Sequence, residues 1–432
     1  MKIRTAAMSY EDVLALKPQK HKKPMKQLLL FRLLLRIVSM PDLLVTGFKC
    51  EKIGMEKLGK KEPCLILMNH SSFIDLKIAS TILFPRAFNI VCTSDGFVGK
   101  NWLMRLLGCI PTRKFQFDVG LVKDMLYAVK DLNSSILMYP EASYSFDGTA
   151  TPLPESLGKC LKLLKVPVVM ISTKGAFARD PLYNSLQLRK VKVSATMEYL
   201  LSPQDITEKS AEELNEILAK QFSFDHFKWQ QENNVRIREK FRADGLNRVL
   251  YKCPHCKTEG QLIGKGIHLT CSSCGKKYEL TEYGYIQALD GETEFPHIPD
   301  WYQWERDCVR QEIESGSYYL ERQVDIYMLV NTRCVYHVGE GCLIHSKDGF
   351  HLTGCSGMLE YSQKPSSSYS LYSDFCWYEI GDMICIGDDK AQYYCFPKDG
   401  GDIVAKTRLA TEEMYKIGKK NSVRTGRKKA VS

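Results

Sequence analysis

Apolar residues between Cys64 and about Leu200 occur in short runs that alternate with segments of helical spacing. Short runs rich in Val, Ile and Leu predict buried strands, and apolar residues three and four positions apart predict amphipathic helices. The predicted strands are Cys64–Met68, Ala87–Cys92, Ser135–Tyr139, Val166–Ser172 and Lys190–Tyr199. The predicted helices are Phe73–Leu83, Lys100–Leu107, Val119–Leu132, Glu155–Lys165 and Glu208–Gln221. This alternation predicts an α/β domain at 46–250, a sheet flanked by helices.

The pattern changes after this region. Residues 225–251 are polar, with Trp229 as the one large anchor, and predict a helical tail or linker. A small cysteine-containing module is expected at 251–285, and a helix at Trp301–Leu320. Up to about residue 410, short β-branched and aromatic runs separated by turn pairs such as Asp348-Gly349 predict a β-rich accessory domain, 286–410. It weakly resembles small regulatory β-domains that end in a helix, such as pleckstrin-homology-like folds.

Residues 411–432 are basic and lack apolar periodicity, so we expect a disordered tail there. Contact of this tail with a membrane or nucleic acid is the alternative.

The N-terminal segment, 1–45, contains the strongest apolar run, Lys23–Val45, but Arg32, Arg36, Pro41 and Asp42 interrupt it, so we do not expect it to span a membrane. On a helix, Arg32, Arg36 and Ser39 share one stripe and leucines cover the rest. We expect a helix that lies in a membrane interface, with nearby lysines attracted to anionic lipid. A helix packed into the core is the alternative. The lysines are Lys17, Lys20, Lys22, Lys23 and Lys26.

Composition narrows the class of protein. The chain has 432 residues, 44% of them hydrophobic, which is typical of a globular protein of two or three domains. Its net charge of +10 favours anionic partners, namely nucleic acid, a membrane surface or phosphate-bearing substrates. Sixteen cysteines are scattered without a secretory signal, so we expect a reducing compartment and a cytoplasmic protein at the inner face of a membrane.

The first candidate site is the stretch CLILMNHSSFIDLKI, in which His70 follows a predicted strand and Asp75 falls in the first turn of the next helix. Strand ends carry functional groups in parallel α/β sheets. A carboxylate that accepts from one imidazole nitrogen leaves the other nitrogen available as a base. A structural histidine near a helix start is the alternative for this pair taken alone.

Two further groups follow strand-like or turn segments in the same domain. Arg113 comes after a helix and a turn, where a guanidinium can hold a phosphate through two hydrogen bonds. Glu141 lies directly beyond the run ending at Tyr139, in the same strand-end position as His70.

The order of these blocks resembles the glycerolipid acyltransferases typified by 1-acyl-sn-glycerol-3-phosphate acyltransferase. The matching residues are Asn69, His70 and Asp75 for N-H-x4-D, Gly108 to Arg113 for the second block, Pro140, Glu141 and Ser145 for P-E-G-T-R-S, and Val166 to Val169 for the last. The resemblance implies a membrane-associated enzyme that uses an acyl thioester, either acyl-CoA or acyl carrier protein. It also implies that His70 is the base and Asp75 its orienter, and that third-block residues bind the acceptor's phosphate.

The third block departs from the family pattern. Ala142, Ser143 and Tyr144 stand where the family has Gly, Thr and Arg. Ser143 keeps a hydroxyl, whereas Tyr144 removes a cation from the expected phosphate site, at a cost of about 1.5–3 kcal/mol of binding. Arg113 remains, and Lys77 or Lys159 are candidate replacements.

We therefore expect acyl transfer to the hydroxyl of a lysophospholipid, or of another lipid or polar alcohol. The expected substrate-binding residues are Asn69, Arg113, Glu141, Ser143 and Ser145. A membrane-associated binding or regulatory protein is the alternative.

Two C-x2-C pairs, Cys253/Cys256 and Cys271/Cys274, are separated by residues 257–270. This spacing is typical of a zinc ribbon, because each short loop presents two thiolates to a tetrahedral ion. Four thiolates complete a closed site, so we expect one structural Zn²⁺ and no catalytic role. Such modules often contact other macromolecules. A protein partner for the ribbon or the β-rich domain is therefore the open alternative, and nucleic acid is not the expected partner.

Overall fold

The computed structural model describes residues 2–115, 118–400 and 402–430. Its N-terminal half is built on a seven-stranded sheet of order β2-β8-β7-β3-β6-β4-β5. The central strands β3, β4, β5, β6 and β7 run parallel, and β8 is antiparallel to β7. The strands are β2 (Lys49–Ile53), β3 (Leu65–Met68), β4 (Phe88–Thr93), β5 (Cys109–Thr112), β6 (Ser135–Met138), β7 (Val168–Lys174) and β8 (Ser194–Leu201).

Helices cover both faces of this sheet, and each face has its own apolar core. Side chains of α2 and α3 pack with one face, and those of α5, α6 and α9 pack with the other. The helices are α2 (Leu29–Val45), α3 (Ile74–Ile82), α4 (Asn101–Leu106), α5 (Val119–Lys130), α6 (Leu157–Leu164), α7 (Ala176–Arg179), α8 (Pro203–Glu208), α9 (Ala211–Gln221) and α10 (His226–Glu232). The expected α/β class is confirmed. The strand expected from Lys190 begins at Ser194, and the sequence patterns gave no sign of the short strands β2 and β5.

A separate four-stranded antiparallel sheet carries the cysteines. Its order is β12-β11-β10-β9, with β9 (Leu262–Lys265), β10 (His268–Cys271), β11 (Lys277–Leu280) and β12 (Ile286–Ala288). The ribbon sheet thus extends to Ala288, slightly beyond the expected end at 285. The preceding segment is no free linker, because Leu246, Val249 and Leu250 are buried.

The C-terminal part is an eight-stranded sheet, antiparallel except where β1 (Thr5–Ala7) joins β14 in parallel. Residues 5–7 therefore belong to the C-terminal sheet, although they lie in the segment expected to meet the membrane. The other strands are β13 (Tyr319–Leu329), β14 (Val335–Ser346), β15 (Gly349–Gly354), β16 (Leu359–Gln363), β17 (Tyr372–Trp377), β18 (Gly381–Gly387) and β19 (Gln392–Pro397).

Three helices accompany this sheet, and one of them corrects an expectation. The short α1 is Tyr10–Leu14, and α11 (Ile298–Ser315) replaces the helix expected at Trp301–Leu320, whose last residues begin β13. The expected disordered tail at 411–432 is wrong in its first part, because α12 runs Ile403–Ala430. Buried Leu409, Ala410 and Met414 anchor that helix. Residues 431–432 lie outside the described residues.

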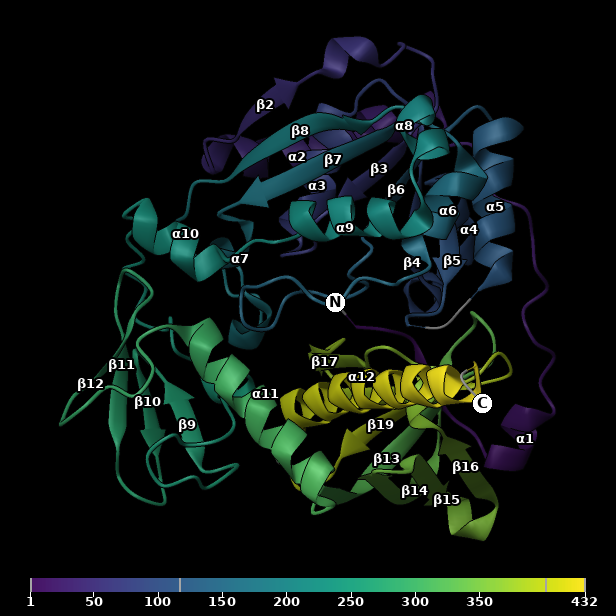
Figure 1. Ribbon diagram of the computed structural model, residues 1–432. Helices are drawn as coiled ribbons and strands as arrows, with labels where there is room; N and C mark the ends of the chain where they lie inside the picture. Colours follow the sequence, from purple (N-terminus) through teal and green to yellow (C-terminus); the bar gives the residue numbers. More distant parts are fainter. Residues whose placement is uncertain (1, 116–117, 401, 431–432) are drawn as a thin grey trace.

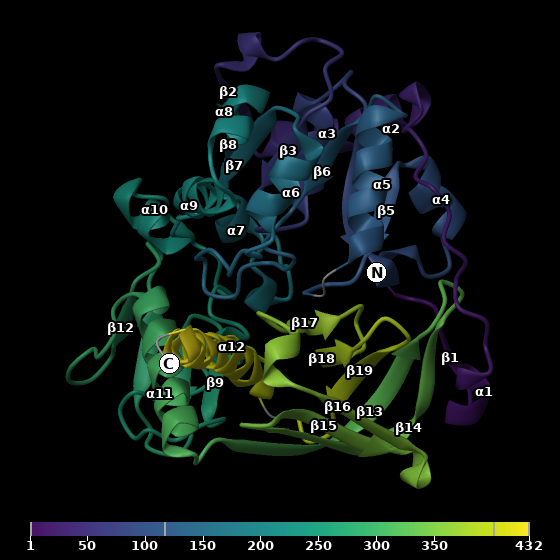
Figure 2. The ribbon, with the colours of Figure 1, turned by 45° about the vertical axis from the view of Figure 1, so that its right-hand side comes forward.

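One apolar cluster connects the three parts of the chain. The largest apolar cluster joins Phe146 and Phe177 of the first half to residues of the cysteine module and the C-terminal sheet. Figures 1 and 2 show α12 between the C-terminal sheet and the loops at the lower edge of the seven-stranded sheet. The accessory parts therefore pack on the edge where the parallel strands end.

Candidate active site

The catalytic candidates lie at the carboxyl edge of the parallel sheet. His70 follows β3, Glu141 follows the adjacent β6, and the segment containing Arg113 and Lys114 follows β5. Because parallel strands end at the same edge, residues far apart in the sequence meet there.

His70 and Asp75 form the expected pair. The Nδ1 atom of His70 lies 3.1 Å from Oδ2 of Asp75. The same carboxylate oxygen accepts the backbone N–H groups of Ser71 at 2.7 Å and Ser72 at 3.0 Å. Asp75 is fully buried in the first turn of α3, and it holds the two residues before the helix while it contacts the imidazole. With Nδ1 directed to Asp75, Nε2 is the nitrogen left for a substrate.

Two tyrosine rings flank the imidazole of His70. The Tyr139 ring stacks at 4.1 Å between centroids, and the Tyr144 ring lies at 4.2 Å with an interplanar angle of 36°. Burial lowers the pKa of His70, and the hydrogen bond and charge of Asp75 oppose this shift. The neutral form, which is the form that accepts a proton, is therefore favoured.

Glu141 holds the loop that carries His70. Its Oε2 accepts the backbone N–H of His70 at 2.9 Å, and its Oε1 accepts the N–H of Thr151 at 3.0 Å. Burial raises the pKa of Glu141 to about 8, although these two N–H donors oppose the rise. The side chain is fully buried, and it links the loop of His70 to the segment of Thr151.

The hydroxyl and amide groups expected to bind substrate make internal hydrogen bonds. Asn69 Oδ1 accepts the N–H of Thr173 at 2.8 Å, and Ser145 Oγ donates to the carbonyl of Thr149 at 2.6 Å. Ser143 Oγ donates to the carbonyl of Tyr144 at 3.2 Å. These three side chains are buried, and they shape the loops around His70.

The cations are arranged differently from the sequence-based expectation. The guanidinium of Arg113 makes no hydrogen bond or ion pair with another described residue, although the backbone carbonyl of Arg113 accepts the Thr112 hydroxyl at 3.4 Å. The neighbouring Lys114 instead places its Nζ 4.0 Å from the centroid of the Tyr372 ring, and its charge contributes to the lowered pKa of His70. Lys77 pairs with Asp42 at 2.6 Å, and Lys159 is exposed. Lys114, one residue beyond the second block, is thus a cation whose charge helps to lower the pKa of His70.

The C-terminal sheet reaches this edge through β17. Tyr372 donates its hydroxyl to Asp95 Oδ2 at 2.8 Å, and Asp95 also accepts from Trp377 Nε1 at 3.2 Å. The rings of Phe146 and Phe375 lie 4.5 Å apart. Phe146, which directly follows the third block, therefore packs on β17 of the C-terminal sheet.

A second histidine, His226, contacts the loop that carries His70. His226 Nε2 lies 3.0 Å from Ser71 Oγ, and its ring stacks on Phe177. Burial lowers the pKa of His226 to about 4, so this ring is neutral at physiological pH. His226, Lys114 and Tyr139 were not expected from the sequence. Tyr139 lies two residues before Glu141 and Lys114 directly follows Arg113, and these positions were the available signals.

The comparison with protein families agrees with this geometry. Residues 49–174 match the family model described as Acyltransferase, and they include all four sequence blocks. This part of the chain is an acyltransferase domain.

One solved structure similar to the chain is a 1-acyl-sn-glycerophosphate (LPA) acyltransferase, PlsC, from Thermotoga maritima. It is 16% identical, covers 44% of this chain and 76% of that chain, and has a TM-score of 0.35. The comparison with curated proteins gives no match.

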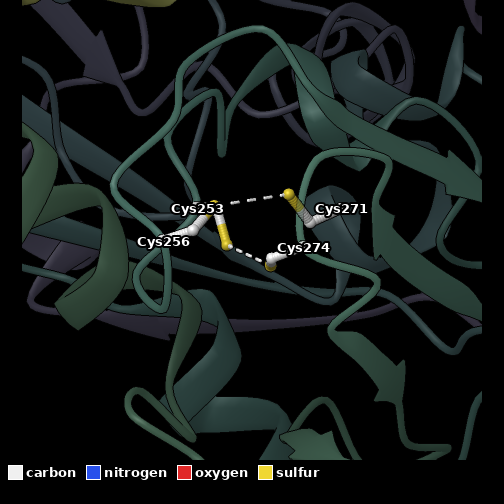
Figure 3. A group of neighbouring side chains, drawn as sticks. All are labelled: Cys253, Cys256, Cys271 and Cys274. Carbon is white, nitrogen blue, oxygen red and sulfur yellow. Dashed lines mark hydrogen bonds between the residues drawn. The ribbon is translucent and has the colours of Figure 1, made fainter.

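The four cysteines beyond the acyltransferase domain come together as expected (Figure 3). Their sulfur atoms all lie within 4.8 Å of one another, with 3.9 Å between Cys253 and Cys274 and 3.7 Å between Cys256 and Cys271. Tetrahedral Zn²⁺ with bonds of about 2.3 Å places its sulfur ligands about 3.8 Å apart. The cluster therefore fits a zinc ion and could hold one.

Helix α2, which precedes the acyltransferase domain, turns its polar stripe toward the protein. Arg32 donates to the carbonyl of Pro85, Arg36 lies over the Phe84 ring at 4.7 Å, and Ser39 is buried. Many apolar side chains of the helix face outward, whereas Leu43 packs into the core. The exposed ones are Leu29, Leu30, Leu33, Leu34, Ile37, Val38, Met40, Leu44 and Val45. Within the described ranges, no helix is both long and apolar enough to cross a membrane.

Proposed function

We propose that this protein transfers a fatty acyl group from an acyl thioester to the hydroxyl of a lysophospholipid such as 1-acyl-sn-glycerol-3-phosphate, in phospholipid biosynthesis. The donor is acyl-CoA or acyl carrier protein. The observation that carries this proposal is the His70–Asp75 pair at 3.1 Å, inside the region that matches the acyltransferase family.

In the proposed reaction, Nε2 of His70 accepts the proton of the acceptor hydroxyl while its oxygen attacks the thioester carbonyl. The carbon–sulfur bond then breaks, and the leaving thiolate takes the proton from the imidazolium. Asp75 keeps Nδ1 protonated throughout and stabilises the imidazolium through its charge. The acyl group passes directly from the thioester to the hydroxyl, and no acyl-enzyme forms.

A thioester enzyme that acts on lysophospholipids needs access to a bilayer, and α2 suits that need. Its outward face carries a row of exposed leucine, isoleucine and valine side chains, and such a row on the surface of a protein marks an interaction site. We propose that this face inserts at the surface of an anionic membrane on its cytoplasmic side, with the lysines of 17–26 next to the head groups.

The cysteine cluster is proposed to bind one structural Zn²⁺. A closed tetrathiolate site holds the small ribbon sheet together, and the ion takes no part in acyl transfer.

The direct test is to incubate the purified protein with acyl-CoA and a panel of lysophospholipids and other alcohols. Turnover that disappears in His70→Ala supports the enzyme. Lipid binding without turnover for any acceptor would favour a binding or regulatory role instead.

A further inference from the structure

Helix α12 of the C-terminal part brings a buried arginine to the third-block loop of the acyltransferase domain. The guanidinium of Arg408 lies over the Phe146 ring, 4.3 Å from its centroid. Phe146 comes two residues after Tyr144, the position at which the family pattern has arginine. Arg408 therefore places a cation next to the third-block loop, in which Tyr144 stands at the position of the family's arginine.

Arg408 is incompletely satisfied, although it is only 3% exposed. Its Nε donates to Glu412 Oε1 at 3.4 Å, but its Nη1 has no hydrogen-bond partner among the residues that the structure describes. Glu412 is in addition paired with Arg306 at 2.7 Å and accepts the hydroxyl of Ser370 at 2.7 Å. A buried guanidinium that shares its carboxylate and leaves a donor unused is costly without a further acceptor.

The charge of Arg408 affects two groups at the carboxyl edge of the parallel sheet, Glu141 and Lys114. Its positive charge opposes the burial that raises the pKa of Glu141, and it adds to the burial that lowers the pKa of Lys114. Strand β17 connects the two cations, because Tyr372 contacts Lys114 and Phe375 contacts Phe146. Two cations from different parts of the chain thus contact aromatic rings that β17 links to the loops at this edge, Lys114 on Tyr372 and Arg408 on Phe146.

This arrangement fits a phosphate group. A phosphate monoester carries about two negative charges at neutral pH, and the fork of a guanidinium matches its oxygens. We propose that Arg408 takes the place of the missing third-block arginine and, with Lys114, binds the phosphate of the acceptor. The inference rests on the proposed function, and it means that the C-terminal domain completes the acceptor site.

The kinetic test compares Arg408→Gln with wild type on two acceptors that differ only in the phosphate, a 1-acylglycerol 3-phosphate and the matching monoacylglycerol. We expect the KM for the phosphate-bearing acceptor to rise about 10- to 100-fold, as for a lost charge-assisted hydrogen bond. The KM for monoacylglycerol and for acyl-CoA should stay unchanged. A rise in the KM for acyl-CoA instead, or an equal rise for both acceptors, would overturn the assignment.

Arg306→Gln is the matched control, because it removes the other guanidinium on Glu412, which pairs with Glu412 and Glu413 and does not lie over the Phe146 ring. It should lower the Tm to a similar degree and leave the KM values unchanged. A gain-of-function arm adds Tyr144→Arg to Arg408→Gln, which should lower the KM for the phosphate-bearing acceptor again. A purely structural Arg408 would give no such rescue. If Arg408→Gln does not fold, Arg408→Lys keeps the charge but loses the fork, and an unchanged KM in that variant counts against the proposal.

A binding measurement separates this inference from the proposed function. Glycerol 3-phosphate should raise the Tm of the wild-type protein, glycerol should not, and Arg408→Gln should lose the effect. If the wild type binds glycerol 3-phosphate through Arg408 but turns over no acceptor, only the proposed function fails. If it transfers acyl groups but Arg408→Gln changes neither binding nor KM, only the inference fails.

Discussion

Glu141 Oε2 accepts the backbone N–H of His70 at 2.9 Å, so the third sequence block fixes the main chain of the first. The other oxygen of Glu141 holds Thr151 in the same way. The carboxyl group therefore positions the loop that carries His70 and is itself shielded from solvent by burial. Glu141, which the family pattern assigns to substrate binding, thus holds two backbone segments in place.

Replacing Glu141 with glutamine should displace His70. Both carboxyl oxygens accept a backbone N–H, and an amide nitrogen accepts none, so one buried N–H loses its partner at a cost of about 1–3 kcal/mol. We expect a lower unfolding free energy in urea together with reduced kcat. Wild-type values of both in Glu141→Gln would refute the bracing role.

Loss of the imidazole should abolish turnover without unfolding the domain. In His70→Ala we expect kcat to fall by about two to four orders of magnitude, the usual contribution of a general base. Circular dichroism and the Tm should remain close to wild type, since the His70 side chain is partly exposed. Asp75→Asn should also lose activity, but it should be less stable, because Oδ2 supports two backbone N–H groups.

The pH dependence follows from the environment of His70. Its pKa in the folded protein lies below the usual 6.5, because burial disfavours the charged ring. The base works only when neutral, so activity should be lost as the pH falls through this lowered value and retained above it. A pH profile of kcat/KM should show an acid limb with its midpoint below pH 6.5. A midpoint above that value would mean that His70 is not the controlling base.

Metal removal should unfold the ribbon sheet selectively. One zinc per chain is expected by elemental analysis, and Cys256→Ser should lower both zinc content and Tm, because the ion supplies much of the folding energy of so small a sheet. Cys160→Ser, outside the cluster, is the control and should keep its zinc. Well-folded wild-type protein without any bound metal would remove the assignment.

Polar substitutions on the outer face of α2 should weaken membrane binding. Leu33 and Val38 are 42% and 70% exposed, so Leu33→Ser/Val38→Ser should not affect folding. Each side chain that enters the bilayer contributes about 1.5–3 kcal/mol, and we expect binding to anionic vesicles to fall at least about tenfold in flotation assays. Leu188→Ser alters an equally exposed leucine elsewhere and should bind like wild type. Equal loss in that control would argue against a specific face.

Much of the α/β part was accessible from the pattern of apolar residues. The buried strands β3, β6 and β7 are continuous runs of Val, Ile and Leu, and such runs have few alternatives to a parallel sheet. The strand β5 was missed because it contains Pro111 and only a few residues. The tail was misjudged because the hydrophobic contacts that hold α12 come from its first turns, before the basic stretch begins.

The sequence by itself determined the chemistry that is available: the His70–Asp75 spacing, the strand-end Glu141 and the paired cysteines are local patterns, and local geometry sets what they can do. Only the tertiary structure decided which cations lie at the carboxyl edge of the first sheet. Lys114 and Arg408 are far apart in the chain and carry no motif, and the packing of β17 and α12 on that edge brings them onto the rings of Tyr372 and Phe146. Long-range packing of this kind depends on surfaces that form only after the strands have paired, so no short stretch of sequence records it.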